Sequence, residues 1–126
     1  MNVSSFDKVV HRPLAEVDRE VRAVLAEAGF GVLTEIDVSA TLREKLGVDR
    51  LPLRILGACN PSLADQALRL DPASALVLPC NVVLRASDDG ATQVSITDPR
   101  TLMDAPAFRE LAADAASRLQ SALERL

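Results

Sequence analysis

The amino-acid sequence predicts one α+β domain that spans residues 1–126. The first observation is the length, since 126 residues is the usual size of one domain and no linker or low-complexity tract divides the chain. The second is the mixed order of strand-like and helix-like segments, with one clear hairpin before the C-terminal part. The third is an amphipathic helix near each end of the chain, which can cover one face of a sheet.

The first half of the chain alternates strands and helices. A strand over residues 3–11 precedes a helix that begins at Pro13, where a missing N–H costs nothing, and ends at Gly29. A second strand covers 30–37, with Phe30, Val32, Thr34 and Ile36 expected on one face. Asp37 or Ser39 then caps a short helix that stops at Gly47. The order favours α+β over a doubly wound parallel sheet.

The second half holds the predicted hairpin. Residues 53–59 read as a strand, and Asn60-Pro61 starts a helix with Asn as its cap. A long apolar strand is expected over 75–86, at a sheet edge or with a bulge because it contains Pro79. An Asp-Gly turn leads to its partner strand at 92–97. A helical turn follows Asp98-Pro99, and the last helix runs from about residue 106 to the end.

Composition narrows the class of function. The chain carries a net charge of −4 and has three Phe but no Trp or Tyr, so it lacks the basic face and stacking rings of a nucleic-acid binder. It has neither an apolar run of about 18 residues nor a signal-peptide pattern, so we expect no membrane span and a cytoplasmic location. No phosphate loop, nucleophile elbow or zinc-ligand pair is present, and we therefore expect no cofactor and no metal.

Several segments resemble a known family. They are 29–37 (GFGVLTEID), 42–47 (LREKLG), 54–61 (RILGACNP) and 78–82 (LPCNV), with Asp98-Pro99 downstream. Together they resemble the bacterial and archaeal domain-of-unknown-function family 302 over most of the chain, roughly from Phe6 to Leu126. The resemblance implies a TATA-binding-protein-like α+β fold: a curved, mainly antiparallel sheet, long terminal helices on one face, inserted short helices and a dimer. It implies no activity.

Two cysteine–asparagine pairs are the most suggestive side chains. Cys59 and Asn60 stand between a predicted strand and a helix N-terminus, where partial positive charge and free N–H groups favour a thiolate or an anion. Cys80 and Asn81 start the next strand. The structural alternative is that Asn60 is a helix cap and Cys80 a core residue. A strand–helix–strand path joins the two thiols, so we expect both, in reduced form, at one end of neighbouring strands.

Glu35 and Asp37 form a second candidate pair. They share one face of a strand, where two carboxylates can serve acid–base chemistry or hold a hard cation. The structural alternative has Asp37 capping the short helix and Glu35 paired with an Arg such as Arg54.

These observations predict a non-enzymatic binding or interaction domain. The helices cover one sheet face, so the other face needs a partner, and a homodimer supplies it. A small-ligand cleft is expected near the two thiols, with a rim of Glu35, Asp37, Cys59, Asn60, Cys80 and Asn81. The alternative is a thiol-dependent enzyme or redox sensor that uses Cys59.

Overall fold

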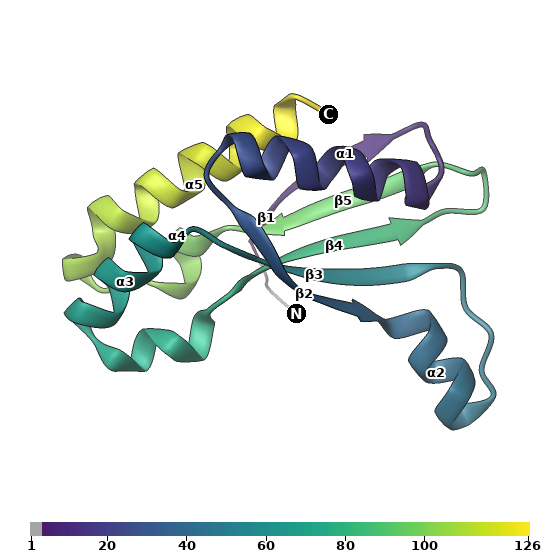
Figure 1. Cartoon of the computed structure of the whole chain (residues 1–126), viewed down its shortest axis with the longest axis horizontal. Helices are drawn as coiled ribbons and strands as arrows, with labels where there is room; N and C mark the ends of the chain where they lie inside the picture. Colours follow the sequence, from purple (N-terminus) through teal and green to yellow (C-terminus); the bar gives the residue numbers. More distant parts are fainter. Residues whose placement is uncertain (1–3) are drawn as a thin grey trace.

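The computed structural model describes residues 4–126 and confirms the α+β class (Figure 1). Its centre is one antiparallel sheet of five strands in the order β1-β5-β4-β3-β2. The strands are β1 (Ser5–Val10), β2 (Gly31–Asp37), β3 (Leu53–Cys59), β4 (Cys80–Ala86) and β5 (Thr92–Thr97). The edges are therefore β1 and β2, and the predicted β4–β5 hairpin lies inside the sheet.

Two long helices, α1 (Leu14–Glu27) and α5 (Arg109–Glu124), lie side by side over one face of the sheet (Figure 1). The shorter helices are α2 (Val38–Leu46), α3 (Pro61–Leu70), α4 (Pro99–Leu102) and the 3-10 turns η1 (Pro72–Val77) and η2 (Pro106–Phe108). No helix among residues 4–126 is long and apolar enough to cross a membrane.

The core lies between these two helices and the inner face of the sheet. Alternate residues of the three central strands point into it, and α1 and α5 supply the opposite wall through their apolar stripes. The most deeply buried side chains are Val17, Val21 and Leu25 of α1, Leu56, Val82, Leu84, Val94 and Ile96 of the sheet, and Leu119 of α5.

The strand predicted over 75–86 is wrong in its first part. Residues Pro72–Val77 form η1, and β4 begins only at Cys80. The side chain of Asp71 accepts a hydrogen bond from the N–H of Ala73 and starts the 3-10 turn, and Pro79 has no N–H to offer a ladder. Pro79 instead packs over Gly57, where a Cβ atom would lie 2.7 Å from the proline Cγ.

The face assignment predicted for β2 is also wrong. Val32 lies opposite Ala58 and Thr34 opposite Gly57, so Leu33 is an extra residue and forms a bulge. The bulge inverts the alternation. Val32 stays on the helix-facing side, whereas Thr34 and Ile36 turn to the other face and their places are taken by Glu35 and Asp37.

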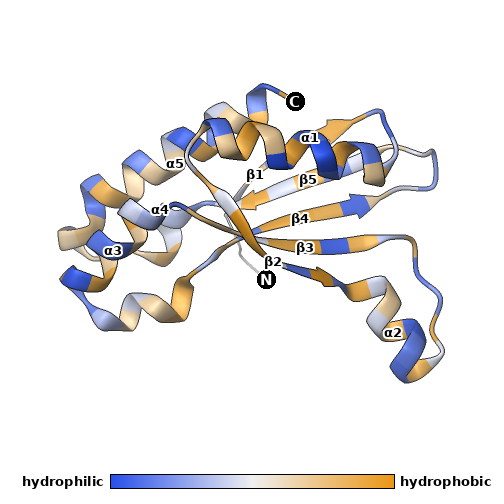
Figure 2. Ribbon diagram, viewed as in Figure 1, coloured by the Kyte–Doolittle hydropathy of each residue, from blue (hydrophilic) through white to orange (hydrophobic). Residues whose placement is uncertain are grey.

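The bulge begins a segment that leaves the body of the molecule. Residues 33–52, called the arm below, comprise most of β2, all of α2 and the loop before β3, and none of them is buried. Figure 2 shows apolar positions among the polar ones of α2 and its loop. The large apolar side chains that the arm exposes are Leu33, Ile36, Leu46, Val48 and Leu51.

Candidate functional site

The two thiols meet at one end of the sheet, as predicted. Cys59 is the last residue of β3 and Cys80 the first of β4, and Ala58 lies directly opposite Cys80 in the antiparallel pair. Both cysteines are free and line one cavity that α3 and α5 close from the other side. It is called the thiol cavity below.

The thiol cavity is small and apolar. Its volume is about 30 Å³, which is room for one or two water molecules. The polar lining residue Asn60 is already engaged, because its Oδ1 accepts a hydrogen bond from the N–H of Leu63 at 3.1 Å and caps α3. The structural alternative for Asn60 is therefore confirmed, and an organic ligand enters only if the walls move.

Burial raises the pKa of both thiols. For Cys59 the cause is burial. For Cys80 burial comes first and the neighbouring Cys59 second, and together they raise the pKa to about 11. Both side chains are thus protonated thiols at neutral pH, and a thiol is a weak nucleophile.

Glu35 and Asp37 lie elsewhere, on the helix-facing side of β2. The carboxylate of Glu35 forms ion pairs with Arg22 at 3.5 Å and Arg54 at 3.4 Å. Asp37 caps α2: its Oδ1 accepts hydrogen bonds from the N–H of Ala40 at 2.9 Å and the hydroxyl of Ser39 at 2.7 Å. Both structural alternatives are confirmed, and neither carboxylate is within the lining of the thiol cavity.

Asp18 of α1 binds the same two arginines as Glu35, and the sequence analysis did not single it out. It is 6% exposed and accepts hydrogen bonds from Arg22 at 2.6 Å and Arg54 at 2.8 Å. Its burial alone would raise the pKa of the carboxyl, but the two guanidinium groups outweigh burial and lower it. The signal was present, since Asp18 falls at helical spacing within the stripe of Leu14, Val21 and Leu25.

Asn81 lies on the opposite face of the sheet from Cys80 and is exposed. The six candidate residues therefore occupy three places: Cys59, Asn60 and Cys80 at the thiol cavity; Glu35 and Asp37 beside α1 and α2; Asn81 on the open face. Among residues 4–126, no group of three or more His, Cys, Asp or Glu side chains could hold a metal ion.

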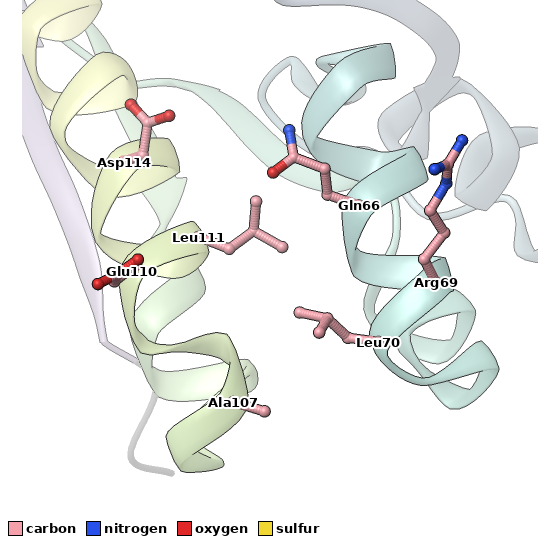
Figure 3. Close-up of a pocket in the computed structure, with 7 residues that line it drawn as sticks. All are labelled: Gln66, Arg69, Leu70, Ala107, Glu110, Leu111 and Asp114. Atoms are coloured by element: carbon pink, nitrogen blue, oxygen red, sulfur yellow. The ribbon is translucent and has the colours of Figure 1, made fainter.

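A wider groove, which no sequence motif indicated, lies between α3 and α5 (Figure 3). Its volume is about 510 Å³, and Leu70 and Leu111 from the two helices face one another across it. Asp114 of its α5 wall is already paired with Arg118 at 2.9 Å, and Arg69 of its α3 wall with Asp65 at 3.0 Å. The groove is open, and Arg69 and Asp114 each pair within their own helix, which leaves Glu110 as the one lining charge without an ion pair among the described residues.

Comparison with known proteins identifies the family of this chain. Residues 6–126 match the model described as "Domain of unknown function DUF302". The chain belongs to this family. A crystal structure of an uncharacterized conserved DUF302 protein from Bacillus stearothermophilus has 32% sequence identity and a TM-score of 0.87, with 96% of each chain covered. No curated protein matches the chain.

Proposed function

We propose that this DUF302 domain is a non-enzymatic homodimeric binding module whose arm makes the contact between the two copies. The arm is the observation that carries the proposal. Ten large apolar side chains are exposed among residues 4–126, and the five of the arm come from only 20 successive positions, 33–52.

Contact of these apolar side chains with water is unfavourable in free energy, and a partner that covers them removes that contact. Burying one Leu, Val or Ile side chain completely contributes about 1.5–3 kcal/mol. Exposed apolar side chains concentrated in one short segment favour an interaction site, whereas apolar residues scattered singly need no explanation. Val9 on β1, 54% exposed and separate from the arm, is an example of the scattered kind.

The open face of the sheet continues the apolar surface of the arm. Ile36 of β2 pairs with Ile55 of β3, which pairs with Val83 of β4, and all three lie on the face that α1 and α5 leave uncovered. Further along the same row Ser95 and Asp7 follow, and the hydroxyl of Ser95 donates to Asp7 at 2.5 Å. The apolar part of the open face thus adjoins the arm, and the polar part lies at β1.

Sedimentation tests the dimer. At micromolar concentration we expect 2 × 13.5 = 27 kDa for the wild-type chain. The double variant Leu46→Lys/Leu51→Asp should sediment as a monomer with an unchanged circular dichroism spectrum, because it charges the arm without touching a buried residue. Val9→Lys is the matched control and should remain a dimer. A wild-type chain of 13.5 kDa would refute the proposal.

The ligand part of the proposal concerns the thiol cavity. A small, mostly apolar guest would contact Cys59, Asn60 and Cys80 and would displace the half-buried Leu78 and Met103 that line the same cavity. Native mass spectrometry of the purified protein should show an adduct that Ala64→Leu, which fills the cavity from α3, removes. An adduct that survives this substitution, or no adduct in either chain, contradicts a ligand at this place.

The alternative of a thiol enzyme or redox sensor gives a different result in thiol titration. If Cys59 and Cys80 are structural, both should react slowly near neutral pH, Cys59 faster because Cys80 is the more strongly shifted, and both faster as pH rises. Rapid labelling of Cys59 at pH 7 would favour the catalytic alternative over ours.

A nucleic-acid partner is not part of the proposal. The net charge of −4 disfavours the neutralisation of phosphates on which such binding depends. A gel shift at low salt, the condition that favours such binding most, should show no retarded band with duplex or single-stranded DNA.

A further inference from the structure

We draw no further inference here: the strongest candidate, the groove of about 200 Å³ between η1 and α4 with the exposed side chains of Leu76 and Leu102 in its walls, is an apolar surface open to solvent, and nothing in the structure shows what covers it.

Discussion

The body of this domain and its arm contain the same kinds of element, and they differ in how much surrounds them. In the body, α1 and α5 press on the inner face of β3, β4 and β5, and Leu56, Leu84 and Leu119 are fully buried. In the arm, β2 and α2 have caps, a bulge and regular hydrogen bonds, yet no side chain is buried. Regular secondary structure therefore forms here without burial of its side chains, while most of the stability comes from the two helices that pack over the sheet. The arm should be the part of the fold that contributes least to stability and most to association.

The largest difference in stability is expected between truncating one leucine of the body and truncating one leucine of the arm. Leu119→Ala, in the middle of the core, should lower the free energy of unfolding by about 2–5 kcal/mol through lost burial and the cavity left behind. Leu46→Ala in the arm should change the stability of the monomer by no more than about 0.5 kcal/mol. Urea unfolding under dilute conditions measures both. Equal losses would mean that the arm is packed as tightly as the body.

A smaller contrast is expected from two glycines on neighbouring strands. A Cβ at Gly57 would lie 2.7 Å from Cγ of Pro79 and closer still to the hydroxyl of Thr34, so Gly57→Ala should destabilise the domain by about 1–3 kcal/mol. Gly31→Ala is the control, because nothing lies within 4 Å of its added methyl group. The two variants should differ clearly in the midpoint of thermal unfolding. Similar midpoints would show that Pro79 can move away from the added methyl group without cost.

The helix caps give a third contrast. Asn60→Ala should cost about 1 kcal/mol, since the N–H that Asn60 caps on Leu63 is shielded from water in the body. Asp37→Ala at the start of α2 should cost less, about 0.5 kcal/mol, because water replaces the lost acceptor at this exposed position. Denaturant titration checks the pair. A cost near zero for Asn60→Ala would indicate that its amide serves something other than α3.

The smallest expected effect is a pH dependence. Asp18 has a lowered pKa in the folded chain, against about 3.9 when unfolded, so the folded chain holds this proton less tightly. Its stabilising contribution is present above about pH 4 and is lost as pH falls through the folded pKa. Asp18→Asn should therefore flatten the fall in stability below about pH 5.

The carboxyl of the arm supplies the control for this pH effect. Hydrogen bonds from the N–H of Ala40 and the hydroxyl of Ser39 lower the pKa of Asp37 as well, so its contribution has the same sign. Asp37 is exposed, however, and Asp37→Asn should flatten the acid limb less than Asp18→Asn does. The reverse order in a series of unfolding curves between about pH 2 and 7 would show that the ion pairs beside α1 are not what acid disrupts.

Local features were largely predictable because their causes are local. Pro13 and Gly29 bound α1, Asn60 and Pro61 begin α3, and Asp89-Gly90 turns the hairpin; each acts through its own backbone or a neighbour within a few residues. The approach of Cys59 and Cys80 also followed from chain order alone. The six residues predicted to form the rim of one cleft lie at three separate places, because they were grouped by residue type and not by the sheet face on which each lies.

The sequence by itself determined the α+β class, the positions of nearly all helices and strands, and the cap Asn60, and it narrowed the cap of α2 to Asp37 or Ser39, because periodicity and capping depend on residues close in the chain. Only the tertiary structure decided that Leu33 bulges, that Glu35 turns toward Arg22 and Arg54, and that residues 72–77 wind as a 3-10 turn. The tertiary structure also decided that no other element of the chain packs over the arm. These outcomes depend on which strand lies alongside and what packs over it, and no window of neighbouring residues contains that information.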